Sequence, residues 1–100
     1  MAMQVKAQAC PESMFGLGRV TATPGALKYL EHIEEQPMNL IHRHVTGDWG
    51  DLCADDIKAN HQSILDGTRI LSAYILNGEK LYVITEGDRS ITTLLLASEY

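Results

Sequence analysis

Residues 69–86 read RILSAYILNGEKLYVITE, and this stretch decides the fold. Two runs rich in β-branched and aromatic residues, Arg69 to Leu76 and Lys80 to Glu86, flank the dipeptide Asn77-Gly78. Asn-Gly between two such runs is the strongest short-range signal for a type I′ β-hairpin, because both central residues of that turn need a positive φ. The stretch therefore predicts two antiparallel strands joined by a tight turn.

The residues on both sides of this hairpin extend the pattern. After the polar turn Gly87-Asp88-Arg89, a third strand is expected over Ser90 to Leu96. The pattern changes at Gly67. Before it, the apolar residues do not alternate but have the spacing that is typical of amphipathic helices. A helical N-terminal part and a strand-rich C-terminal part are therefore expected.

Three helices are expected in the N-terminal part. The first begins at Thr23-Pro24, because the threonine hydroxyl can cap free N–H groups and proline has no N–H to leave unpaired. It ends near Gln36, and the second helix spans Pro37 to about His44. The third spans Leu52 to Asp66. Its expected apolar face is formed by Ile57, Ile64 and Leu65.

These elements predict an α+β fold in which the N-terminal helices pack on one face of a C-terminal three-stranded antiparallel meander. Leu17 to Ala22 could add a short N-terminal edge strand. Residues 1–16 lack a sustained period and are expected to form a loosely ordered arm, whereas residues 17–100 form a single domain. A chain of 100 residues is one domain's worth of sequence.

Both faces of the expected sheet carry apolar side chains. Along its first strand, Leu71, Ala73 and Ile75 point one way, and Tyr74 points the other. The second face must therefore be covered by the N-terminal arm or by another chain. We expect a twofold homodimer, with contacts at Tyr74, Tyr82 and Ile84.

The 13 acidic residues outnumber the 8 basic ones, which gives a formal net charge of −5. Proteins that neutralise phosphates carry clustered Lys and Arg, whereas the basic residues here are scattered, so direct nucleic-acid binding is not expected. No apolar run approaches the ~20 residues of a membrane span, and the N-terminus lacks the features of a signal peptide. A soluble cytoplasmic protein without membrane contact is expected.

The cysteines and histidines do not have the spacing of a metal site. Cys10 and Cys53 lie far apart and outside any C-x-x-C motif, so both are expected to be reduced thiols. On a helix, His42 and His44 would point to different faces because they are separated by one residue. No metal and no cofactor are expected.

Four segments together resemble one protein family. They are Gly18 to Leu27, His44 to Gly50, Leu71 to Tyr74 and Ile84 to Thr93. Through these segments the chain resembles a family of small bacterial proteins, often carried on plasmids and other mobile elements, that are labelled plasmid-related protein or type I restriction endonuclease subunit M. The resemblance covers most of Leu17 to Tyr100. It implies a mobile genetic element as the setting and assigns no role to any residue.

The second label names an activity that can be compared with the sequence. A restriction modification subunit binds S-adenosylmethionine on a Rossmann-like sheet with a glycine-rich first turn, and it holds a flipped base with a motif such as N-P-P-[FY]. This chain has neither motif and is too short for that fold. The label is therefore not taken to describe its activity.

The loop Gly47-Asp48-Trp49-Gly50 holds the single tryptophan of the chain. Tryptophan is a frequent anchor of protein interfaces, so an exposed Trp49 would suit partner recognition. The alternative is that its indole folds back onto the core while Asp48 bonds nearby backbone amides in a turn. The candidate partner-binding residues are Trp49 and the acidic residues around it, namely Asp48, Asp51, Asp55 and Asp56.

Acidic residues are concentrated in the helical half of the chain. Such a surface can imitate DNA phosphates and occupy a basic groove on a partner, although a solvated helix surface has the same composition. Because no catalytic motif stands out, the sequence and the resemblance predict a non-catalytic accessory or interaction protein of a mobile genetic element. Its expected partner is a host nucleic-acid-handling or defence protein, which it would inhibit.

The alternative function is that of a small barnase-like ribonuclease. Such enzymes use Glu, His and Arg for acid–base cleavage with phosphate stabilisation. Glu86, Arg89 and His44 could fill those roles. The acidic net charge argues against this alternative, because a ribonuclease carries an electropositive substrate groove. A polar turn with a local ion pair to Arg89 is the other explanation for these residues.

Overall fold

The hairpin at Asn77-Gly78 is confirmed in the computed structural model, which describes residues 13–100. Strand β2 (Ile70–Leu76) pairs antiparallel with β3 (Glu79–Thr85), which pairs antiparallel with β4 (Ile91–Leu96). Asn77 and Gly78 have φ values of 50° and 86°. Both residues of the turn therefore have the positive φ that a type I′ turn requires.

A fourth strand, β1 (Arg19–Ala22), pairs parallel with β4, so the sheet is mixed and has the order β1-β4-β3-β2. The expected three-stranded antiparallel meander is therefore wrong, although the α+β class is confirmed. Gly18 makes this pairing possible, because its φ is +66° and a Cβ there would collide with the backbone of Ser90. A strand of four residues is too short for its pattern of apolar and polar side chains to indicate which strand it pairs with.

Within residues 13–100 three α-helices form, as expected: α1 (Pro24–His32), α2 (Pro37–Val45) and α3 (Ala54–Asp66). Thr23 caps α1 by accepting the Ala26 N–H at 3.2 Å. This helix ends before the expected Gln36, because Glu34 has a φ of 59° and turns the chain towards α2. A short 3-10 helix, η1 (Ala97–Glu99), follows β4.

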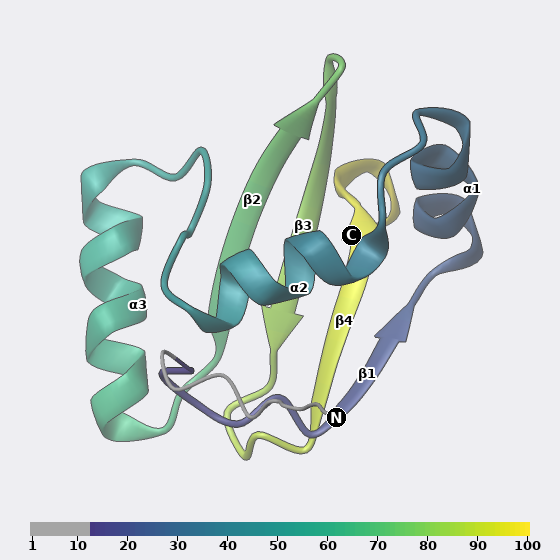
Figure 1. Ribbon diagram of the computed structural model, residues 1–100. Helices are drawn as coiled ribbons and strands as arrows, with labels where there is room; N and C mark the ends of the chain where they lie inside the picture. Colours follow the sequence, from purple (N-terminus) through teal and green to yellow (C-terminus); the bar gives the residue numbers. More distant parts are fainter. Residues whose placement is uncertain (1–12) are drawn as a thin grey trace, which may run out of the picture.

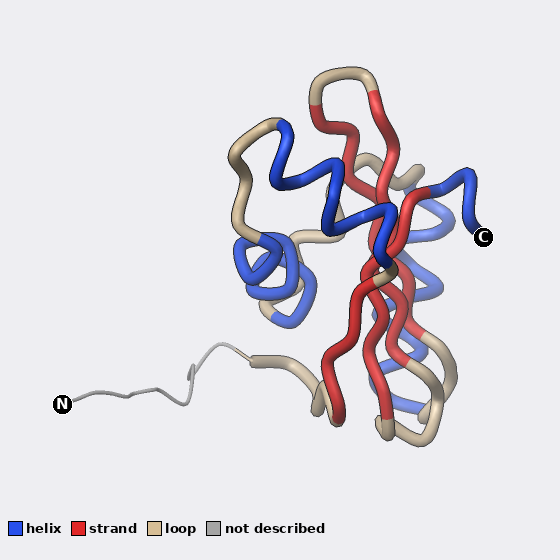
Figure 2. The backbone as a smooth tube through the Cα atoms, turned by 90° about the vertical axis from the view of Figure 1, so that its right-hand side faces the viewer, coloured by secondary structure: helices blue, strands red, loops and turns tan. Residues whose placement is uncertain are grey.

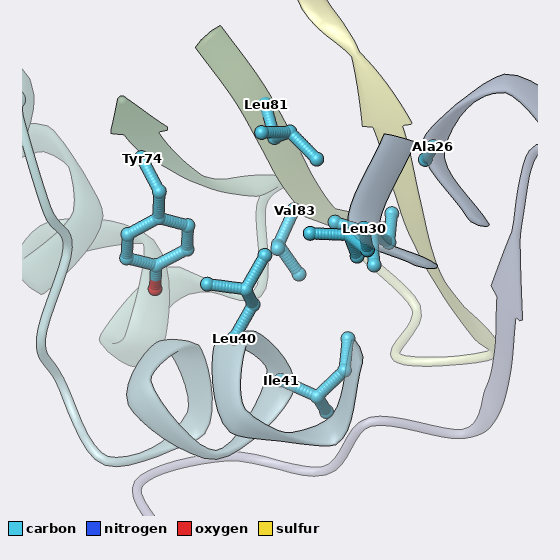
Figure 3. Packing of buried hydrophobic residues seen from close by; sticks show 8 residues of the cluster. Ala26, Leu30, Leu40, Ile41, Tyr74, Leu81 and Val83 are labelled. Atoms are coloured by element: carbon cyan, nitrogen blue, oxygen red, sulfur yellow. The ribbon is translucent and has the colours of Figure 1, made fainter. Parts of the chain in front are cut away.

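Helices α1 and α2 cover one face of the sheet, which we call the front face (Figures 1 and 2). In Figure 3, Leu40 and Ile41 of α2 and Leu30 of α1 point towards the strand residues Leu81 and Val83. These side chains belong to one buried cluster, which is completed by Ala26, Tyr74 and Leu94. The hydrophobic core therefore lies between these two helices and the front face.

Helix α3 lies beside β2, on the other side of the sheet from α2 (Figures 1 and 2), so the expectation that all the helices pack on one face is wrong. Its two buried residues are polar, Asn60 and Ser63. Leu65, which the sequence placed on the apolar inner face, is 81% exposed, so that expectation is wrong. The reason is that α3 contacts a strand edge, where backbone groups need polar partners more than apolar ones.

The outer edge of β2 is closed by hydrogen bonds from two directions. The Asn60 amide bonds both backbone groups of Leu71, accepting its N–H at 3.1 Å and donating to its carbonyl at 2.6 Å. Next along the strand, Ala73 donates its N–H to the Trp49 carbonyl and accepts the Asp51 N–H. These contacts pair backbone groups that an edge strand otherwise leaves open.

Residues 1–12 of the expected N-terminal arm lie outside the described residues, and so does Cys10. The described part of the arm packs on the protein: Met14 donates its N–H to the Val45 carbonyl at 2.8 Å, and the Phe15 ring lies against His44. No helix in residues 13–100 is both long enough and apolar enough to span a bilayer.

Candidate functional site

His44 of α2 is a fully buried ionisable residue, with 0% of its surface exposed. The helix places it on the same face as Leu40 and Ile41, which pack on the core. Its ring joins a chain of hydrogen bonds that crosses the sheet near the end where β3 stops and β4 begins. Nδ1 lies 2.6 Å from the Ser72 hydroxyl, and Nε2 lies 2.9 Å from the Thr85 hydroxyl.

The donor and the acceptor of each hydrogen bond in this chain follow from the bond that Thr92 makes at its far end. Thr92 donates its only hydroxyl hydrogen to the Leu17 carbonyl at 2.7 Å, so it must accept the hydrogen bond from Thr85, also 2.7 Å long. Thr85 then has no hydrogen left for His44 and accepts from Nε2–H. The neutral ring is therefore the Nε2–H tautomer, and Nδ1 accepts from Ser72.

We call this chain of Ser72, His44, Thr85, Thr92 and the Leu17 carbonyl the histidine relay. Burial lowers the pKa of His44 from 6.5 to about 4, because the charged ring would lose its hydration. Protonation of Nδ1 would also remove the acceptor that Ser72 uses. The relay therefore favours the neutral ring, and it ties α2, three strands and the N-terminal segment together.

Trp49 lies beside the relay and is only 4% exposed. Its indole makes an edge contact with the His44 ring and stacks with Phe15, with ring centroids 6.0 Å and 6.1 Å away. Nε1 is buried and has no hydrogen-bond partner among residues 13–100. Of the two interpretations of this residue, the structure shows the indole folded onto the core.

Asp48 and Asp51 are exposed, and each has a structural contact. Asp48 accepts from the Arg43 guanidinium at 2.7 Å, which lowers the pKa of the carboxyl group and raises that of Arg43. It also accepts the Gly50 N–H at 3.2 Å, as expected for a turn aspartate. Asp51 accepts the Ile75 N–H at 2.9 Å and thereby extends the closed edge of β2. These contacts fix the loop before α3.

Asp55 and Asp56 occupy the first turn of α3, where negative charge is favoured by the helix dipole, and both are exposed. Together with Asp48 and Asp51 they form what we call the acidic segment, a set of exposed carboxylates on the loop and the first turn of α3. Arg43 offsets one of these charges. The structure thus places these candidate residues close along one stretch of chain, with Trp49 buried beneath it.

The three residues of the ribonuclease alternative do not share one exposed site. His44 faces Ser72 and Thr85 inside the protein, whereas Glu86 pairs with Arg69 at 3.3 Å on the surface. Arg89 has a φ of 59°, and its guanidinium donates to four backbone carbonyls. These belong to Ser63, Thr68, Glu86 and Gly87. Arg89 thus fixes the turn before β4 against the end of α3.

The three expected dimer contacts lie on different faces of the sheet. Tyr74 is fully buried on the front face, where its hydroxyl donates to the Asp48 carbonyl at 2.7 Å. Tyr82 and Ile84 lie on the opposite face. There the Tyr82 ring contacts Tyr100, and Ile84 is already buried within one chain.

In residues 13–100 no pocket is detected, and no group of three or more His, Cys, Asp or Glu side chains is arranged to hold a metal ion. Cys53, just before α3, is a free and exposed thiol. No protein-family model, curated protein or solved structure matches the chain.

Ser72, Thr85 and Thr92 were not predicted from the sequence as partners of His44. A usable signal was present, because the hairpin register places Ser72 and Thr85 on the same face as Tyr74 and Leu81. Polar residues at core positions of a sheet need partners. His44 lies on the apolar stripe of α2, the helix that crosses this face, and was therefore an available hydrogen-bond partner.

Proposed function

We propose that this protein is a non-catalytic interaction protein that binds a protein partner through the acidic segment. The observation that supports the proposal most directly is that Asp48 and Asp51 are exposed yet held by Arg43 and by the β2 backbone. A binding surface that is already ordered loses less conformational entropy when a partner docks. Asp55 and Asp56 extend the same negative surface onto α3.

The partner that fits such a surface carries a basic groove. Proteins that handle nucleic acids present such grooves to phosphates, and ordered carboxylates can occupy the same positions. The resemblance to proteins of plasmids and mobile elements suggests the setting: an accessory protein that acts in the cytoplasm and inhibits a host nucleic-acid-handling or defence complex. No cofactor or metal takes part in this proposed function.

A capture experiment with matched charge variants tests the proposal. The full-length protein is immobilised and exposed to bacterial host lysate at low and high salt, and the bound proteins are identified. We expect a nucleic-acid-handling protein whose capture falls at high salt, because exposed charge pairs are screened. The paired change Asp55→Asn with Asp56→Asn should reduce capture at least tenfold.

The control is the paired change Glu31→Gln with Glu34→Gln. It removes the same charge from exposed positions near α1 and should leave capture unchanged. Equal loss in both variants would mean that net charge alone attracts the partner. Capture that ignores salt and both variants, or RNA cleavage by the pure protein that Glu86→Ala and Arg89→Ala abolish, would contradict the proposal.

A further inference from the structure

The two edges of the sheet differ in a way that the proposed function does not explain. At β2, side chains and a loop bond the outer backbone groups of Leu71, Ala73 and Ile75. At the opposite edge, β1 is the last strand in the sheet order. Among residues 13–100, no helix, loop or side chain gives its outer backbone groups a comparable set of partners.

The hydrogen bonds to β4 identify which groups of β1 point outward. Arg19 donates its N–H to the Ser90 carbonyl at 3.0 Å, and Thr23 donates to the Leu94 carbonyl at 2.9 Å. Backbone groups alternate in direction along a strand, so those of Val20 and Ala22 point away from the sheet. Val20 is 40% exposed, and Figure 2 shows β1 at the side of the sheet that faces the viewer.

We propose that this edge binds the β1 edge of a second copy of the chain, antiparallel and about a twofold axis at Thr21. In that register Val20 lies opposite Ala22 of the other copy, and each such pair exchanges its N–H and carbonyl groups in both directions. The twofold axis generates two such pairs of Val20 and Ala22. The two sheets then form one continuous sheet across the interface, and no part of the acidic segment takes part.

The side chains of β1 are compatible with this self-pairing. On one face, the exposed Val20 would pack beside the small Ala22 of the second copy. On the other face, the two Thr21 side chains meet at the axis. Arg19 is the only ionisable residue of β1, and the register places it opposite the neutral Thr23. The strand pair therefore has no facing like charges, which are one means by which proteins prevent an open edge from pairing.

A second copy is favoured over a foreign strand because the register satisfies both copies equally. The interface would be isologous, the commonest form of homodimer. It also differs from the homodimer expected from the sequence, since Tyr74 and Ile84 are buried within one chain. The new contact lies at the sheet edge rather than on a sheet face.

The test uses a disulfide at the predicted axis in the full-length protein. With Cys10→Ser and Cys53→Ser as background, Thr21→Cys places two thiols at a position where facing Cα atoms are about 4.5 Å apart, within reach of a disulfide. Mild oxidation should convert most of the protein to a covalent dimer. Arg19→Cys in the same background should give at least tenfold less, because its own counterpart lies several residues away along the edge.

Val20→Pro provides the second arm. It removes the outward N–H of Val20, while the N–H groups of Arg19 and Thr23 keep their bonds to β4. Added to Thr21→Cys, it should reduce cross-linking at least tenfold, whereas Val20→Thr should not. Circular dichroism checks that each variant folds. Monomeric protein by light scattering with no cross-link at Thr21→Cys, or cross-linking that is equal at Arg19→Cys or unaffected by Val20→Pro, would overturn the proposal.

Discussion

At the scale of single residues, polar side chains hold this fold together at places where backbone or core groups need partners. Asn60 bonds both backbone groups of Leu71, much as a neighbouring strand would. Arg89 donates hydrogen bonds to backbone carbonyls near the end of α3 and in its own turn. Neither role is visible in the sequence, because Asn60 lies 11 positions from Leu71 and Arg89 lies 26 positions from Ser63.

Asn60→Leu tests the residue scale. The change preserves size but removes the donor and the acceptor for Leu71, leaving two backbone groups without partners at a partly buried edge. We expect the free energy of unfolding to fall by roughly 2–3 kcal/mol, measured by urea denaturation. Gln62→Leu, on the exposed side of the same helix, should change it by less than about 0.5 kcal/mol. Equal effects would show that Asn60 does not close the edge.

At the scale of elements, local signals predicted what depends on local chemistry. Asn77-Gly78 gave the hairpin and its register, and Thr23-Pro24 gave the start of α1. The sequence could not show that β1 joins β4, because a parallel pairing has no local turn to set its register. It also misplaced Leu65, because an amphipathic pattern assumes that the packed side of a helix is apolar.

Gly50→Ala tests the loop that closes the β2 edge. Gly50 has a φ of +76°, and a Cβ there would collide with the Ala73 carbonyl and the Tyr74 ring. We expect a loss of about 3 kcal/mol or more in the free energy of unfolding, since strain and overpacking add. Gly16→Ala is the control, because a Cβ there has only the Arg89 side chain nearby, at 4.0 Å. A Gly50→Ala protein as stable as the control would mean that the loop is not pressed against β2.

At the scale of the whole molecule, His44 and Arg89 bond groups within the fold, and the carboxylates of the acidic segment remain outside. The sequence pointed to the carboxylates of the acidic segment as candidates, but it could not decide whether Trp49 was exposed. Its burial depends on Phe15, which comes from a distant part of the chain, and on the buried ring of His44. The candidate surface was therefore visible in the sequence, whereas the histidine relay emerged only from the pairing of strands.

The relay makes overall stability depend on pH. Because the pKa of His44 is lowered to about 4 in the folded protein, unfolding takes up a proton between about pH 4 and 6.5. Its stabilisation is complete above pH 6.5 and is lost as the pH falls towards 4, by roughly 3 kcal/mol in total. Urea denaturation at pH 7 and 4.5 should show this loss, and His44→Gln should show little of it. His42→Gln, at an exposed position of α2, should keep the wild-type dependence.

That His44 holds the sheet together instead of serving as an exposed acid or base is tested most directly by its own titration. The measurement is an NMR titration of the His44 ring in the wild-type protein. We expect one neutral tautomer with the proton on Nε2 and a pKa of about 4 for His44, because the ring is buried between Ser72 and Thr85. A ring that exchanges tautomers and titrates near 6.5, the ordinary value, would contradict the histidine relay.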